Sequence, residues 1–129
     1  MITDSKRETD PPLPTRARGA RAEFLAEHKL AELGYKIITR NYFCKYGEID
    51  LIAVESGELV FVEVRSRHSS EALNPLFTLD QRKIKRIIRT AKFYLSGKNI
   101  DSPMRFDFVI VTLGATPEFE IIRNAFDAP

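Results

Sequence analysis

The sequence predicts an α/β fold in which a mixed central β-sheet is flanked by helices. Two amphipathic segments have helical periodicity, and they alternate with runs rich in β-branched and aromatic residues. One helical segment lies between two strongly apolar runs, an order that favours a parallel crossover within a single sheet. A chain of 129 residues is long enough to bury one core, so we expect one folded domain.

The first helix follows a polar, proline-containing stretch. Residues 1–16 have almost no apolar periodicity, which predicts a flexible arm before a single domain at 17–129. Apolar residues then recur at spacings of three and four, and Gly34 provides a stop signal. We therefore predict a helix over 18–33.

The next segments predict strands. Residues 35–43 form one strand, and 47–67 form a strand pair whose turn is Ser56 and Gly57, because glycine adopts the positive φ of tight hairpin turns. Alternation of side chains then predicts one wholly apolar face on this pair. That face contains Ile49, Leu51, Ala53, Val60, Val62 and Val64.

The second half of the chain continues the alternation. Thr78 and Gln81 have the spacing of a capping box, which predicts a helix from there to about Leu95. Residues 105–113 are β-branched and aromatic and predict a central strand, and 118–126 predict a last, peripheral strand.

Charged residues interrupt the apolar strand pair. The predicted register places Asp50 opposite Glu63 and Glu48 opposite Arg65. Carboxylates that face each other at roughly 5 Å between Cβ atoms repel. A divalent cation removes this repulsion, so Asp50 and Glu63 are candidate ligands for Mg²⁺ or Mn²⁺. The alternative is a set of solvated charges with a Glu48–Arg65 ion pair.

A further carboxylate, Glu23, falls within the apolar stripe of the first helix, between Phe24 and Leu30 on the helical wheel. Carboxylates are rare in such a stripe. Glu23 either lies at the edge of the stripe and reaches water, or reaches over the sheet to a cation or base.

The second helix is strongly basic on one side. Residues 80–95 hold six Lys or Arg against one acid, while the apolar positions recur on the opposite side. The basic side is either a solvated face or a rim that contacts phosphates. Its residues are Arg82, Lys83, Lys85, Arg86, Arg89 and Lys92.

Other classes of site find little support in the sequence. A single cysteine excludes an internal disulfide, and Cys44, His28 and His68 lack zinc-ligand spacing. Nothing resembles a signal peptide or a membrane span, so we expect a cytoplasmic protein with no membrane partner.

Several segments resemble the YraN-like bacterial family, over about residues 18–112: AEFLAEHKLAELGY, RNY, GEIDLIA, LVFVEVRSR, RKIKRIIRTAKFYL and RFDFVIV. This family is similar to restriction-endonuclease-like nucleases and Holliday junction resolvases. The resemblance implies a restriction-endonuclease-like fold, Mg²⁺ or Mn²⁺ as cofactor, and DNA, in particular branched DNA, as partner. Resolvase-like proteins commonly act as dimers because a DNA junction is symmetric. The sequence leaves open whether this protein forms a homodimer.

The superfamily signature PD-(D/E)XK can be placed on these residues. Asp50 and Glu63 correspond to its metal-binding carboxylates, Arg65 occupies the lysine position, and Glu23 corresponds to the helix glutamate that often completes the site. These four are the implied catalytic residues. The implied contacts to nucleic acid come from Arg82, Lys83, Lys85, Arg86 and Arg89.

Two departures from the family pattern bear on function: EVR replaces the usual EVK, and Ala22 stands where glycine is usual. An arginine stays protonated and prefers bidentate contact with phosphate, so Arg65 suits anchoring better than proton transfer. From the resemblance we predict a metal-dependent nuclease-like enzyme that acts on DNA, and from Arg65 we predict retained metal and nucleic-acid affinity with slowed or absent cleavage. The alternatives are a catalytically impaired nucleic-acid-binding module that keeps the fold, unless Lys83 replaces the missing lysine, and an interaction protein with a relic site.

Overall fold

The computed structural model describes residues 14–71 and 74–128. The predicted arm lies outside the described residues except for its last three, and two of these already belong to the first helix. The elements are α1 (Thr15–Glu32), β1 (Lys36–Cys44), β2 (Gly47–Glu55), β3 (Glu58–His68), the 3₁₀ helix η1 (Pro75–Thr78), α2 (Gln81–Leu95), β4 (Met104–Leu113) and β5 (Glu118–Phe126).

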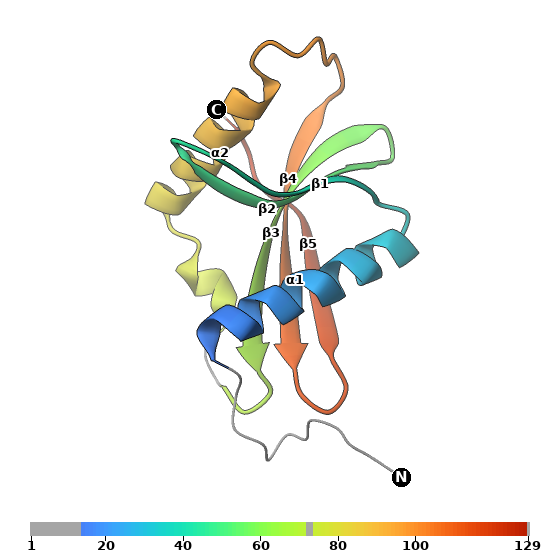
Figure 1. The fold of residues 1–129 in the computed structure, drawn as a ribbon, viewed down its shortest axis with the longest axis vertical. Coiled ribbons are helices and arrows are strands. Elements are labelled where there is room, and N and C mark those ends of the chain that lie inside the picture. Colours follow the sequence, from blue (N-terminus) through green and yellow to red (C-terminus); the bar gives the residue numbers. More distant parts are fainter. Residues whose placement is uncertain (1–13, 72–73, 129) are drawn as a thin grey trace.

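The five strands form one mixed sheet in the order β1-β2-β3-β4-β5. The β3–β4 pair is parallel and is joined through α2, whereas the other three pairs are antiparallel. Figure 1 shows α1 crossing one face of this sheet, with α2 beside the β1–β2 hairpin. The predicted mixed α/β architecture is confirmed, including the central position of β4 and the peripheral position of β5.

Each helix covers its own hydrophobic core. On one side Ala22, Ala26 and Leu30 of α1 pack with buried residues of β2, β3 and β4. On the other side α2 contributes Ile87 and Ile88, which pack with buried residues that include aromatic side chains of β3 and β4. Both helices are therefore held by apolar stripes, which leaves their polar sides free at the edge of the sheet.

The register of the β2–β3 hairpin is confirmed near its turn. Ser56 and Gly57 have φ of 55° and 78°, and the flanking pair is Glu55 with Glu58. Positive φ at both turn residues gives the twist that fits a two-residue hairpin.

The β2–β3 ladder ends at Leu51 and Val62, before it reaches the charged residues. Beyond this point β2 stays paired with β1, and the two strands leave β3 together (Figure 1). The side chain of Asp50 replaces the missing ladder bond, since its Oδ2 accepts a hydrogen bond from the Val64 N–H at 2.7 Å.

Two predictions at this fork are wrong. Glu48 pairs with Phe43 of β1 and not with Arg65, because β2 has separated from β3 there. Ile49 packs in the core under α2 with Tyr42, not with the predicted apolar face under α1. A ladder extrapolated from the turn does not include the twist that carries the β1–β2 hairpin away.

Both helix starts also differ from the prediction. Helix α1 begins at Thr15, not at 18, because its first turn is polar and periodicity does not detect it. The N-cap of α2 is Asp80, whose Oδ1 accepts the Lys83 N–H at 2.9 Å. Thr78 does not cap the helix, since its hydroxyl donates to the Pro75 carbonyl oxygen within η1. No helix within residues 14–71 and 74–128 is long and apolar enough to cross a membrane.

Candidate active site

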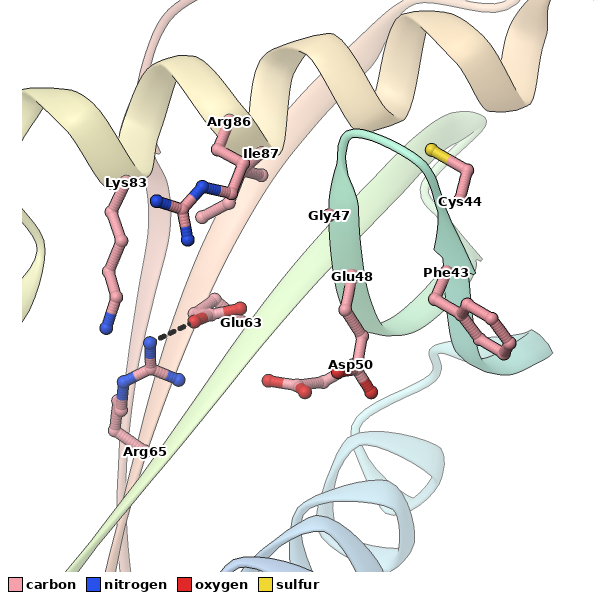
Figure 2. Close-up of a pocket in the computed structure, with 10 residues that line it drawn as sticks. All are labelled: Phe43, Cys44, Gly47, Glu48, Asp50, Glu63, Arg65, Lys83, Arg86 and Ile87. Atoms are coloured by element: carbon pink, nitrogen blue, oxygen red, sulfur yellow. Dashed lines mark ion pairs between the residues drawn. The ribbon is translucent and has the colours of Figure 1, made fainter.

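The charged residues converge on a cavity of about 510 Å³ at the fork between β2 and β3, beneath α2 (Figure 2). Glu48 and Asp50 come from β2, Glu63 and Arg65 from β3, and Lys83 and Arg86 from α2. The sheet opens at this fork. Strands β2 and β3 place the acidic side chains beside the cavity, and α2 places Lys83 and Arg86 there.

Asp50 and Glu63 form the acidic centre. Both residues are 9% exposed, and their carboxyl groups are hydrogen-bonded to each other. Burial and the nearby charge of Asp50 raise the pKa of Glu63 to about 8, although Arg65 opposes this. Burial also raises the pKa of Asp50, but the Val64 N–H and Arg65 favour its anion. Burial and Asp50 thus favour the protonated form of Glu63, whereas the ion pair with Arg65 favours its anion.

Glu23 of α1 joins this centre from the other side of the sheet. Its pKa is raised to about 7, first by burial and then by the charge of Asp50 and a hydrogen bond to it. Glu23 is half-buried, and besides its contact with Asp50 it lines a separate cavity with other residues of α1 and with Arg40 of β1. Asp50 is thus the carboxylate that links Glu23 and Glu63.

This arrangement limits how a cation could be held. No group of three or more His, Cys, Asp or Glu among the described residues is placed to hold a metal ion. Asp50 and Glu63 supply oxygen atoms only, the donor type that Mg²⁺ prefers, and Mg²⁺ usually keeps several waters. The donor set therefore fits a hard divalent cation held by two carboxylates, with water or phosphate in the remaining positions.

Arg65, at the lysine position of the signature, is committed to neighbouring acceptors. One terminal nitrogen lies 2.5 Å from Glu63 Oε2, and the other donates to the Val64 carbonyl oxygen at 3.1 Å. Lys83 approaches the same centre from α2 and lowers the pKa of Glu63 through its charge. Figure 2 shows Lys83 and Arg86 extending from the helix toward Arg65 and Glu63.

The basic side of α2 extends from this cavity. A second cavity of about 310 Å³ is lined by Arg82, Lys85, Arg86 and Arg89 together with the β1–β2 turn. Because Arg86 lines both cavities, the five predicted nucleic-acid contacts form one continuous basic wall that begins at the carboxylates.

Sequence reasoning missed a positioning role for Gly47. Its φ is 153°, and a Cβ there would lie 2.9 Å from Arg86 Cγ and 3.1 Å from Thr90 Oγ1. Only glycine lets the hairpin approach α2 this closely, and this contact holds the Arg86 stem at the cavity. The signal in the sequence for this role was Gly47 itself, a glycine directly before Glu48. Phe43, which also lines the cavity, gave none.

The fold and the site define a class: an α/β protein with a helix on each face of a mixed sheet, and a buried acidic centre beside a basic helix. The chain belongs to the Uncharacterised protein family UPF0102, whose profile matches residues 22–111. This result confirms the YraN-like resemblance of the sequence.

Relatives of nearly the same length support the assignment. A UPF0102 protein of Wolinella succinogenes is 43% identical over 110 residues, which cover 85% of this chain and 96% of that protein. One of Thermotoga petrophila is 44% identical over 99 residues, with coverage of 77% and 90%. Among solved structures, a repair endonuclease from Pyrococcus abyssi aligns with 83% of this chain at a TM-score of 0.42 and 21% identity. The aligned chain spans 43% of that endonuclease.

Proposed function

We propose that the protein is a metal-dependent nuclease that acts on DNA, with Asp50 and Glu63 holding Mg²⁺ or Mn²⁺. The observation that carries this proposal is the pair of adjacent buried carboxylates that line one cavity together with Lys83 and Arg86. Two facing acids at this depth cost stability unless a proton or a cation compensates them. A bound cation supplies charge neutralisation at a phosphate and an activated water.

The surrounding residues have distinct roles in this proposal. Asp50 would bind the cation as an anion, the form that the hydrogen bond from the Val64 N–H favours. Glu23 holds a proton next to Asp50 and accepts or returns it as charge at the site changes. Lys83 and Arg86 face the cavity from α2 and anchor the phosphate.

The first experiment pairs metal binding with cleavage. We expect calorimetry to detect Mg²⁺ or Mn²⁺ binding in the wild type, and metal-dependent cleavage of a labelled four-way junction or a linear duplex. Asp50→Asn should abolish binding and lower cleavage by at least about 100-fold. Asp101→Asn, at an exposed position in the α2–β4 connection, is the matched control and should leave both unchanged. Cleavage that survives in Asp50→Asn would refute the proposal.

A second function is favoured by the ion pair between Arg65 and Glu63. An arginine that neutralises a metal ligand competes with the cation, which fits a nucleic-acid-binding module with impaired catalysis. Arg65→Lys separates the two functions. A nuclease impaired by its arginine should gain at least about tenfold in cleavage, whereas a nuclease that relies on Lys83 should change little and lose activity in Lys83→Met. Lys98→Met, at an exposed position in the α2–β4 connection and outside both basic cavities, is the control for Lys83.

A further inference from the structure

The end of β1, next to the β1–β2 turn, carries an aromatic side chain that the proposed chemistry does not use. Phe43 is 77% exposed, and its ring lies at the rim of the acidic cavity. Figure 2 shows it on the far side of Asp50 and Glu48 from Lys83 and Arg86. Single exposed apolar residues are common on protein surfaces, so exposure alone assigns no role. The position of Phe43 beside the carboxylates is the informative observation.

A second aromatic residue, Tyr46 of the β1–β2 turn, lies among the cations of α2. The ring of Tyr46 is 5.7 Å from the Arg89 guanidinium carbon and 5.3 Å from Lys45 Nζ, and it meets the ring of Phe93 edge to face at 5.7 Å. Tyr46 and Lys45 line the second cavity together with the basic residues of the helix. Aromatic side chains interleaved with cations are the pattern of surfaces that bind single strands, where bases stack on rings and cations follow the phosphates.

We propose that the β1–β2 turn and α2 together bind a single-stranded segment of DNA, and that Phe43 stacks on an unpaired base next to the carboxylates. This inference rests on the proposed nuclease function and names its substrate class: DNA that is single-stranded or splayed at the cleavage site.

The layout of charges supports this choice over an intact duplex. With the basic wall on one side of the carboxylates and Phe43 on the other, a strand that crosses the cavity has its phosphates on α2 and one base at Phe43. In a duplex that base is paired and stacked, so contact with the ring requires unstacking, which costs free energy. A duplex contacts the same cations but gains nothing from the exposed ring.

The test is fluorescence anisotropy in EDTA, which separates binding from cleavage. The probes are a labelled single strand of about 15 nucleotides and the duplex of the same length. Wild type should bind the single strand more tightly. Phe43→Ala should weaken single-strand binding about tenfold and duplex binding less than about twofold, since stacking on one base is lost and no cation is removed. Its salt dependence should equal that of wild type.

Two further variants complete the experiment. Phe43→Trp should retain or strengthen single-strand binding, because a larger ring stacks at least as well. Phe24→Ala, which removes a ring that is 57% exposed on α1 and lines a different cavity, should change neither affinity. The inference is overturned if wild type binds the duplex as tightly as the single strand, or if Phe43→Ala weakens both equally or neither. In EDTA no metal ion is bound at the carboxylates, so this test measures DNA binding alone. The nuclease proposal is tested separately, by the cleavage activity of the Asp50→Asn variant.

Discussion

The sheet contains two clusters of charged residues, and they differ in how their charges are balanced. At the β2–β3 turn Arg105 donates to Glu55 and Glu58 at 2.6 Å each and to Asp107 at 2.9 Å. Asp107 is buried and also accepts from the Tyr35 hydroxyl at 2.7 Å. Each of these acids has a donor, and the hydrogen bond from Arg105 lowers the pKa of Glu55.

In the second cluster, the acidic cluster at the fork, carboxyl groups also lie next to one another, although Arg65 pairs with Glu63. Glu23, Asp50 and Glu63 meet there, and the pKa of each is raised, mainly by burial. Glu55 and Glu63 show the contrast well, since both side chains are 11% exposed but their pKa values shift in opposite directions. The balanced cluster suits a purely structural role, whereas in the acidic cluster Asp50 and Glu63 repel each other when both are ionised.

The largest stability effect should come from breaking the balanced cluster. Arg105→Met should lower the free energy of unfolding by roughly 3–5 kcal/mol, because it removes the charged donor that three carboxylates share. Arg123→Met is the matched control: that side chain is 49% exposed and lies 4.0 Å from Glu55, so the loss should stay below about 1 kcal/mol. Urea denaturation measures both. Similar losses in the two variants would contradict a structural role for Arg105.

A matched pair of Glu→Gln variants should give effects of opposite sign. Glu55→Gln should lower the free energy of unfolding by about 1–2 kcal/mol, since it weakens a charged hydrogen bond to Arg105. Glu63→Gln should raise it by about 1 kcal/mol at pH 8 without metal, since the amide cannot ionise next to Asp50. Thermal and urea unfolding check both values. If Glu63→Gln instead lowered the free energy of unfolding, the result would contradict repulsion between Glu63 and Asp50.

A third comparison uses the pH dependence of stability in EDTA. Glu63 titrates at about 8 and Glu23 at about 7 in the folded protein, against an ordinary value of 4.5, so folding favours their protonated forms. Their contribution is complete below pH 4.5 and is lost as pH rises through 7 and 8.

Thermal unfolding should therefore show a decreasing melting temperature between pH 5 and pH 9, with a smaller decrease in Glu63→Gln. Saturating Mg²⁺ should flatten the profile, because the cation replaces the protons. A melting temperature that rises across this range would argue against shared protons at the fork.

The sequence predicted most of the fold, because the strongest signals there are local. Ser56 and Gly57 define the turn, alternation around it defines the register, and the apolar stripe of α2 defines which side of the helix is buried. The meeting of Asp50 with Glu63 followed from that register, and the meeting of Glu23 with Asp50 was one of two open outcomes.

What the sequence could not predict depends on twist and on long-range packing. Departure of β2 from β3 moved Ile49 to the other core and removed the expected Glu48–Arg65 pair. The partners of Arg105 come from β2, β3 and β4, and no spacing along the chain relates them. The close contact between Gly47 and Arg86 likewise joins a turn and a helix that lie far apart in sequence.

The hydrogen bond from the Val64 amide to Asp50 gives the molecule an internal spectroscopic probe. This backbone N–H belongs to the central strand β3 but ends on an ionisable side chain instead of a carbonyl oxygen. Its proton resonance should therefore follow the charge on Asp50, whether a proton or a cation changes that charge. One amide signal in an NMR spectrum can thus report occupancy of the site without any substrate.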